Sequence, residues 1–487
     1  MRQKHDVKIV GGHCLSKVLK TPRFQFLVDL TCRATCPEFL YHQFPEKIGL
    51  KQPGRPERFM HAAITKQARN GLRLMTIENE TIRDLHAQFD QHTDRAGTGS
   101  IKWQFRVSDG RLIEWDRTDA SHGEDRVLPM WVADMDFQAA PAIHEAVMSV
   151  ARHGVYGYTA PTSEYFESVC AWMSRRQDWY AEPEWVVPCP GIVPAFHLAV
   201  RRFTQPGDKV LIQSPVYHPF TYAAETNGRI PLSSALHLAN EHYEMDFDDL
   251  ERKAADPAVK VALLCSPHNP VGRVWTYDEL NRFAQICTHN DVLIVADEIH
   301  ADLTMPGFEF TAFGKLEPML LENAIICTAP SKAFNLAGLQ ASNLVIRNEA
   351  LRESMRAELR SCGLFTLNPF GLAAVRAAYD KSEVWLDAAR SYINDNLDRL
   401  EAFASTDLPG IKVIRPQGTY LAWLDCRGLG LSDADLGTLF MDKAKLYLDE
   451  GHIFGPEGSG FMRLNVACPR SILDTALERL RQAISGN

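Results

Sequence analysis

The 487-residue chain lacks several features that mark whole classes of protein. It has no apolar run long enough to span a bilayer, and residues 1–20 lack the apolar stretch of a secretory signal. Its net charge of −9 offers no basic face to a nucleic acid. Its 11 cysteines contain no C-x-x-C pair and its 17 histidines no H-x-x-x-H spacing. We therefore expect a cytoplasmic protein without a metal, a nucleic-acid partner or a membrane partner.

Residues 1–74 differ in charge from the rest of the chain. They carry 14 basic and 5 acidic residues, a balance of +9, whereas the remainder has a balance of −18. They show no sustained helical or strand period, and they contain a single serine, Ser16, where organelle transit peptides are rich in serine. We expect an N-terminal extension outside the fold, with the native chain starting at or near Met75; a transit peptide is the alternative.

From about Leu128, short apolar runs alternate with helical patterns, which predicts an α/β fold. Strands are expected at residues 209–215, 259–265, 291–296, 324–328, 411–415 and 420–424. Thr276 and Glu279 form a capping box at the start of a helix between the second and third of these strands. A strand–helix–strand unit of this kind indicates a mostly parallel sheet.

Polar side chains follow several of the predicted strands directly. They are Tyr217, Asn269, Asp297 and the pair Ser331 and Lys332. In an open parallel sheet, ligands bind beyond the carboxyl ends of the strands, so these residues share one rim. Each of them alone would most often cap a turn or face solvent. Their conjunction, in this order, is what indicates a site.

The set matches the needs of pyridoxal phosphate (PLP), which requires a lysine, an acid, a donor and an aromatic ring. Lys332 would carry the cofactor as a Schiff base, and Asp297 would keep its ring nitrogen protonated. Asn269 would donate a hydrogen bond to its phenolic oxygen, and Tyr217 would stack on the ring face. The sequence therefore predicts a PLP enzyme.

Four segments make the chain resemble the fold-type I PLP enzymes, and among them the MalY/PatB-type cysteine-S-conjugate β-lyases. The segments are Arg95–Trp103, Leu128–Phe137, Asp297–Asp302 and Phe461–Arg470. The run W-V-A-D-M-D-F at residues 131–137 is highly specific, whereas the S-P-x-N-P and S-K elements are shared with many aminotransferases. The resemblance runs from roughly Ile77 to the C-terminus. It implies a large domain with a mostly parallel sheet flanked by helices, and a smaller α+β domain.

The resemblance and the sequence patterns together divide the chain into four parts. Residues 1–74 are the extension, and residues 75–127 form an N-terminal segment that packs on the small domain. Residues 128–350 form the large PLP-binding domain, and residues 351–487 form the small C-terminal domain.

The phosphate of the cofactor needs its own donors. Gly191, Ile192 and Val193 precede a helical stretch, and their backbone amides would suit a phosphate because the helix dipole favours an anion there. A simple turn glycine is the alternative for Gly191. Ser331 is a further donor. Aminotransferases usually place an arginine eight residues after the lysine, and here that position is Gln340. The charge partner of the phosphate is therefore unassigned.

The resemblance implies roles for three further residues. Arg463 would clamp the substrate α-carboxylate, a bidentate task that suits arginine better than lysine. Tyr158 would reach into the site of a neighbouring subunit, which implies a homodimer with shared sites; a buried core tyrosine is the alternative. His300 would contact the cofactor where aminotransferases usually have tyrosine, which favours the lyase subgroup.

These features predict a β-lyase that cleaves L-cystathionine or a related cysteine S-conjugate to a thiol, pyruvate and ammonia. Lys332 would remove the Cα proton as general base. An aminotransferase on the same scaffold is the first alternative, because it would share every cofactor residue. A protein that uses the scaffold to bind a transcription regulator is the second, and no sequence feature marks such a surface.

Overall fold

The computed structural model describes residues 81–108, 110–115 and 126–486. The chain divides into two units, Met1–Ile77 and Glu78–Asn487, and all described residues belong to the second. The predicted extension 1–74 and the predicted start at Met75 lie outside the described residues. Among the described residues, no helix combines the length and the apolar character that a bilayer crossing requires.

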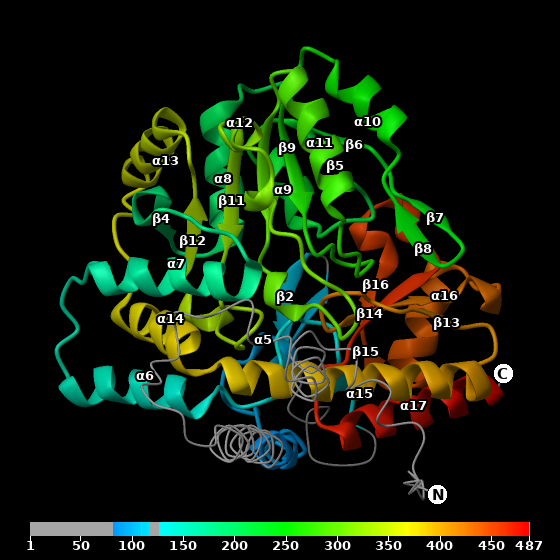
Figure 1. The fold of residues 1–487 in the computed structure, drawn as a ribbon. Helices are drawn as coiled ribbons and strands as arrows, with labels where there is room; N and C mark the ends of the chain where they lie inside the picture. The colour runs from blue at the N-terminus through cyan, green and yellow to red at the C-terminus, as the bar shows by residue number, and fades with distance from the viewer. Residues whose placement is uncertain (1–80, 109, 116–125, 487) are drawn as a thin grey trace, which may run out of the picture. The chain divides into compact units, whose positions relative to one another are not determined.

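A seven-stranded sheet forms the centre of the large domain (Figure 1). In spatial order its strands are β4 (Val186–Cys189), β12 (Ser342–Val345), β11 (Ala324–Thr328), β10 (Leu293–Asp297), β9 (Val259–Cys265), β5 (Lys209–Ile212) and β6 (Ile230–Ser233). Within this sheet β12 is antiparallel to both of its neighbours, while the pairs from β11 to β6 are parallel. The predicted α/β fold with a mostly parallel sheet is confirmed.

Both faces of the sheet are covered, which explains why its strands are continuous apolar runs. Along β9, Val261 and Leu263 join the core on one face, while Ala262 and Leu264 join the core on the other. The first face is covered by α8 (Ile192–Phe203), α9 (Pro219–Glu225) and α13 (Glu349–Ser361), and the second by α7 (Ser163–Gln177), α11 (Tyr277–His289) and α12 (Pro318–Leu321). A strand buried on both sides keeps no polar alternation.

Helix α11 begins with the predicted capping box. The Thr276 hydroxyl accepts a hydrogen bond from the Glu279 backbone N–H at 3.2 Å, and the Glu279 carboxylate accepts one from the Thr276 N–H at 2.8 Å. Arg273 donates to both carboxylate oxygens of Glu279 at 2.8 Å. The start of this helix is therefore fixed by local polar contacts that the sequence alone predicts.

A smaller four-stranded antiparallel sheet carries the C-terminal part of the chain. Its order is β13 (Lys412–Ile414), β14 (Leu421–Asp425), β17 (Phe461–Asn465) and β16 (Asp449–Glu450). Helices α15 (Glu383–Asp407) and α17 (Arg470–Ser485) lie beside each other below this sheet in Figure 1. The domain boundary at residue 350 stays a prediction, but α13 packs against α8 of the large domain, and α14 (Pro369–Lys381) against α6 (Pro141–His153) and α7.

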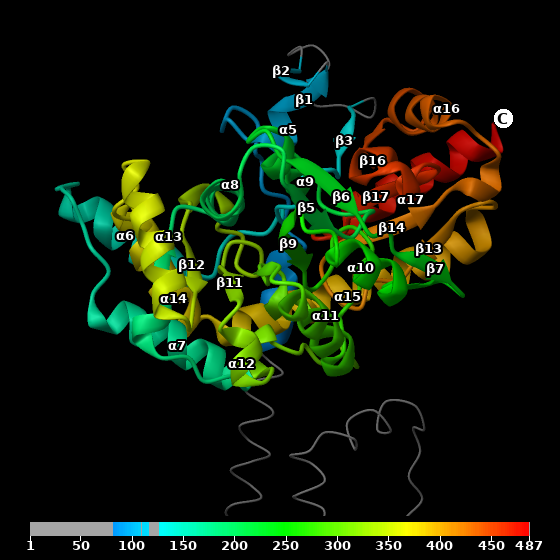
Figure 2. The same ribbon diagram turned by 90° about the horizontal axis from the view of Figure 1, so that it is seen from above.

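The first described residues lie against α15. Residues 81–89 are helical, and the Phe89 ring lies 5.5 Å from Trp385 and 5.7 Å from Tyr392 of α15. Helix α5 (Ile101–Gln104) follows, and then a hairpin of β1 (Phe105–Ser108) and β2 (Arg111–Glu114), seen in blue at the top of Figure 2. The remaining α-helices and strands are β3 (Leu128–Pro129), β7 (His237–Ala239), β8 (His242–Glu244), α10 (Phe247–Ala254), α16 (Asp433–Thr438) and β15 (Leu446–Tyr447).

Candidate functional site

A cavity of about 200 Å³ lies at the carboxyl ends of β9, β10 and β11. Its walls include Gly191, Ile192, Val193, Tyr217, Asn269, Asp297, His300, Ser331 and Lys332 from the sequence prediction, together with Ala133, Pro194, Phe196, Cys265, Ile299, Ala337 and Gln340. The predicted Arg463 touches this set through Asn269, and Tyr158 does not line the cavity. Strand ends thus bring together side chains that are far apart in the sequence.

Lys332 follows β11 and lines the cavity. Its Nζ donates a hydrogen bond of 2.7 Å to the carbonyl oxygen of Ala133. Burial lowers the pKa of the Lys332 ammonium to about 8, and the nearby positive charge of Arg463 acts in the same direction. A lysine with this pKa is a neutral, nucleophilic amine in roughly a tenth of the molecules at pH 7, far more than an unperturbed lysine.

Asp297 is the last residue of β10 and is 3% exposed. One of its carboxylate oxygens accepts a hydrogen bond from the Ile299 N–H at 3.0 Å. Burial raises the pKa of this carboxyl to about 7, while that hydrogen bond and the Lys332 charge oppose the shift. A buried acid of this kind is stabilised by any cation that enters the cavity, so it would bind a protonated ring nitrogen.

Tyr217, Asn269 and His300 supply further polar atoms. The Tyr217 N–H donates to the Asn269 carbonyl at 3.0 Å, and the Asn269 Oδ1 accepts from Arg463 at 2.9 Å, so its Nδ2 is the remaining donor. Burial keeps the pKa of His300 well below its usual range, which leaves a neutral imidazole. Its buried Nδ1 has no hydrogen-bond partner among the described residues. This nitrogen is available to hydrogen-bond with a polar group in the cavity.

The N-terminus of α8 faces the cavity at Gly191, Ile192 and Val193. Gly191 has a φ of +103°, and a Cβ there would lie 2.9 Å from the Gln340 Oε1, so this position requires glycine. No side chain caps this helix among the described residues. The Gly191 N–H donates to the Cys189 carbonyl at 2.9 Å, which leaves the amides that follow it as the donors for an anion.

Arg463 in β17 is 3% exposed, and both of its terminal nitrogens have hydrogen-bond partners. Its guanidinium donates to the Asn269 side chain and to the Trp131 carbonyl, each at 2.9 Å, and forms an ion pair with Asp449 of β16. Its Nε has no partner among the described residues, and its Cζ lies 4.8 Å from the ring of Phe454. Asp449 therefore holds this arginine beside Asn269, and no local sequence signal predicts it.

The segment Trp131–Phe137 links the two domains at the cavity. Asn335, three residues after Lys332, donates to the Met135 and Phe137 carbonyls at 2.9 Å. From the small sheet, Asn465 donates to the Val132 and Asp134 carbonyls at 2.7 and 2.6 Å. Backbone carbonyls of one short segment are thus bound by side chains of both domains.

A largely buried network of ion pairs binds the two aspartates of this segment. Arg95 pairs with Asp134 at 2.8 Å and with Asp136 at 3.0 Å. Lys102, whose side chain is 0% exposed, pairs with Asp136 at 2.8 Å, and the Trp103 indole donates to the same carboxylate at 2.7 Å. Two of the family-like blocks, Arg95–Trp103 and Leu128–Phe137, are therefore joined by charge and hydrogen bonding.

Tyr158 lies in a group of exposed apolar side chains. It is 93% exposed, and its neighbours in the sequence, Val155 and Tyr156, are 70% and 59% exposed. Its ring lies 6.0 Å from that of Phe365, which is 69% exposed. Apolar side chains gathered at such exposure are typical of an interaction surface.

The family model described as aminotransferase class I and II matches residues 127–480. Cystathionine beta-lyase PatB of Bacillus subtilis (strain 168) is 43% identical over 397 residues, which cover 82% of this chain and 100% of that protein. MalY of Escherichia coli (strain K12) is 34% identical over 401 residues, covering 81% and 98%. The structure of cystalysin from Treponema denticola, which contains PLP, aligns with a TM-score of 0.77 at 36% identity, covering 82% and 98%.

Proposed function

The chain belongs to the class I and II aminotransferase family, and we propose that it is a PLP-dependent carbon–sulfur β-lyase. Its substrate is L-cystathionine or another cysteine S-conjugate, and its products are a thiol, pyruvate and ammonia. The observation that carries this function is the 43% identity to a cystathionine beta-lyase over the whole length of that protein. The cofactor residues cannot distinguish a lyase from an aminotransferase, because both would share them. The identity to a cystathionine beta-lyase therefore favours the lyase.

The cavity fits PLP on several independent grounds. Lys332 has an amine for the imine bond, and Asp297 is a buried acid suited to the ring nitrogen. The Asn269 Nδ2 would donate to the phenolic oxygen, and Tyr217 would cover the ring face. The phosphate would bind at the N-terminus of α8 with help from Ser331. The unpaired His300 Nδ1 would gain a partner from the cofactor or the substrate.

When bound, PLP supplies an electron sink for negative charge at the substrate α-carbon. The chain supplies the rest. Arg463 binds the α-carboxylate and orients the substrate, and the Lys332 amine takes the α-proton as general base. Electrons from the broken Cα–H bond form a Cα–Cβ double bond, and the thiolate leaves from Cβ with the C–S bonding pair. The remaining three-carbon fragment takes up water and ends as pyruvate and ammonia.

The assembly that we propose is a homodimer that shares its two sites. Tyr158 is exposed and lies outside its own cavity, and the surrounding apolar side chains would be covered by a second copy. No cationic side chain other than Lys332 lines the cavity among the described residues, so a partner subunit can supply a phosphate contact. Light scattering of Tyr158→Glu beside the unmodified chain tests this, with a shift towards monomer expected.

The cytoplasm is the location that we propose. The cysteines among the described residues are all free thiols, as expected in a reducing compartment. Cell fractionation with an antibody against the native protein tests the location.

The experiment that tests the function is pyruvate release by the full-length protein loaded with PLP. Cystathionine, cystine and an S-alkyl cysteine are supplied without any keto acid, and a parallel assay adds 2-oxoglutarate. The expected result is pyruvate and the sulfur product in equal amounts, independent of the keto acid: a thiol from cystathionine and from the S-alkyl cysteine, and a persulfide from cystine. Turnover that requires the keto acid and releases no pyruvate would identify an aminotransferase instead.

A further inference from the structure

The carbonyl oxygen of Ala133 accepts two hydrogen bonds at the wall of the cavity. One comes from the Lys332 Nζ at 2.7 Å and the other from the Tyr420 hydroxyl at 2.9 Å. Lys332 belongs to the large domain, and Tyr420 immediately precedes β14 of the small sheet. Ala133, in the segment 131–137, contacts both of these side chains. One acceptor is therefore shared by two side chains that are 88 positions apart in the chain.

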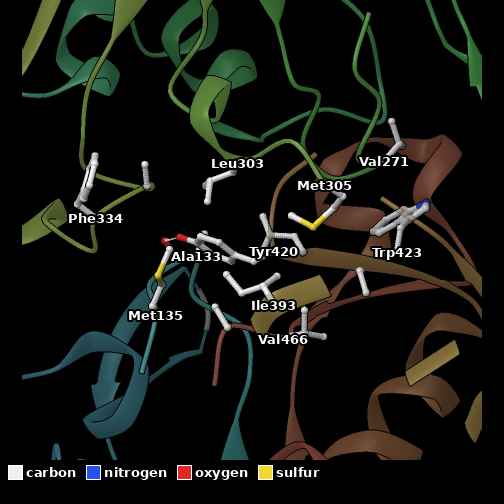
Figure 3. Close-up of a cluster of buried hydrophobic side chains, with 14 of the residues drawn as sticks. Ala133, Met135, Val271, Leu303, Met305, Phe334, Ile393, Tyr420, Trp423 and Val466 are labelled. Carbon is white, nitrogen blue, oxygen red and sulfur yellow. Dashed lines mark hydrogen bonds between the residues drawn. The ribbon is translucent and has the colours of Figure 1, made fainter. Parts of the chain in front are cut away.

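Tyr420 is fully buried, and its hydroxyl has a fixed hydrogen-bond acceptor. Its side chain is 0% exposed, and Figure 3 shows its hydroxyl directed at Ala133, with Met305 and Ile393 among the neighbouring side chains. Burial raises the pKa of the phenol well above its usual range, so the hydroxyl stays protonated and acts as a donor. A buried hydroxyl keeps its hydrogen bond because an unpaired one would be costly.

We propose that Tyr420 is a positioning residue for Lys332, acting through the Ala133 carbonyl that the two side chains share. This inference rests on the proposed function, since it concerns the amine that takes the substrate proton. An amine that donates one N–H to a fixed carbonyl has its lone pair limited to the two remaining tetrahedral positions. Tyr420 fixes the carbonyl, the carbonyl orients the amine, and the lone pair stays available for the α-proton.

The shared acceptor also sets the balance between amine and ammonium. An ammonium donates a stronger hydrogen bond to a carbonyl than an amine does, so a strong acceptor favours the protonated form. Tyr420 draws on the same oxygen and weakens it as an acceptor for Lys332. Other charged or titratable groups around the two side chains are Asp134, Asp136, Asp297, His300 and Arg463. They are unchanged when only the Tyr420 hydroxyl is removed.

The test replaces the hydroxyl and reads the amine without turnover. The full-length Tyr420→Phe chain, freed of cofactor, is labelled with acetic anhydride at a series of pH values, and the peptide that contains Lys332 is quantified by mass spectrometry. The expected result is a rise of about half to one unit in the pH at half-maximal labelling. Incorporation of 3-fluorotyrosine at position 420, a stronger donor of nearly the same size, should move the midpoint down.

A second reading comes from the PLP-loaded enzyme. In Tyr420→Phe, kcat at pH 7 should fall roughly three- to tenfold and recover as the pH rises, with KM changed less than about twofold. Tyr165→Phe is the matched control, because its buried hydroxyl donates to Asn343 at 2.9 Å in the large domain and lies outside the cavity. It should alter the melting temperature alone.

The outcomes separate this inference from the proposed function. An unchanged or lowered labelling midpoint in Tyr420→Phe would overturn the positioning role and show a structural one. The labelling does not depend on which reaction is catalysed. A failure to release pyruvate from any cysteine conjugate would overturn the lyase function and leave the labelling result standing.

Discussion

The large-domain side and the small-domain side of the site are built on different principles. On the large-domain wall, Asn269, Asp297 and Lys332 each lie within four residues of a strand end, so the sheet alone brings them together. On the side of the small sheet, Arg463 and Tyr420 lie outside the cavity lining and contact the lining residues Asn269 and Ala133, and Asp449 pairs with Arg463. We call these two residues the second wall. The first wall is therefore set by local sequence and topology, while the second depends on contacts between distant segments. Substitutions should therefore have different effects on the two walls. Those on the first wall should lower kcat, because its residues make and break bonds, and those on the second should act on the binding and orientation of the substrate.

The largest effect is expected at Lys332. In Lys332→Ala, kcat for pyruvate release should fall by about 10³-fold or more, because the amine is both the anchor and the base. The variant should fold and lose the absorbance of the lysine-bound cofactor. Lys315→Ala, which removes a lysine paired with Asp178 outside the cavity, is the control and should keep full activity. Retention of lyase turnover by Lys332→Ala would contradict the assignment.

The next effect is expected at Asp297. Asp297→Asn keeps the shape but removes the negative charge that would pair with the ring nitrogen, so kcat should fall roughly 10²-fold and PLP should bind more weakly. The matched control is Glu298→Gln, one residue away. Burial raises the pKa of Glu298 to about 8, so this side chain is mostly neutral at pH 7 and glutamine resembles it. Equal losses in the two variants would show that burial, and not the charge of Asp297, matters.

On the other wall, Arg463→Lys should act on binding. Lysine cannot reproduce the bidentate contact, so KM for cystathionine should rise roughly 10- to 100-fold with a smaller change in kcat. Arg427→Lys is the control, because Arg427 is also bidentate, to Asp425, but its side chain is 56% exposed. A fall in kcat at unchanged KM would place Arg463 in the chemistry and blur the difference between the walls.

The pH dependence of stability sharpens the comparison without turnover. In the cofactor-free chain, Asp297 keeps its proton up to about pH 7, whereas the unfolded chain loses it near pH 4. The native state binds more protons in this window, so the Asp297 contribution to the free energy of unfolding falls as the pH rises from 4 to 7. The melting temperature of Asp297→Asn minus that of the parent chain should therefore grow over this range and then level off. A constant difference would contradict the raised pKa.

The smallest effect is expected away from both walls. Thr276→Ala removes the hydroxyl that caps α11 and should lower the free energy of unfolding by about 1 kcal/mol in urea titrations. Pyruvate release should stay unchanged, because the cap lies outside the cavity. Thr475→Ala, which removes an exposed hydroxyl bonded only to a carbonyl of its own helix, is the control and should cost less.

The sequence predicts correctly those features that produce a pattern among neighbouring residues. The predicted strands at 259–265 and 324–328 coincide with β9 and β11, because both faces of the sheet are covered and the apolar runs are unbroken. The capping box of α11 is equally local. The rule that ligands bind beyond strand ends then yields five of the residues that line the cavity: Tyr217, Asn269, Asp297, Ser331 and Lys332.

The positions of the remaining site residues produce no pattern among neighbouring residues in the sequence. Asp449 faces Arg463 only because β16 and β17 pair, and Tyr420 meets Ala133 across 287 positions of chain. Lys102 resembles a solvated lysine in sequence, yet its side chain is 0% exposed and paired with Asp136. Such contacts depend on the register of the small sheet and on the path of the N-terminal segment, which composition and periodicity do not determine.

The ion network behind the segment 131–137 decides where the chain can be shortened. A truncated protein that begins after Trp103 would lack Arg95 and Lys102, the cations that neutralise Asp134 and Asp136. These two largely buried carboxylates would then have lost their cations close to Ala133, whose carbonyl accepts the Lys332 hydrogen bond, at a cost of several kcal/mol. For protein engineering, the N-terminal boundary of the working enzyme therefore lies upstream of Arg95.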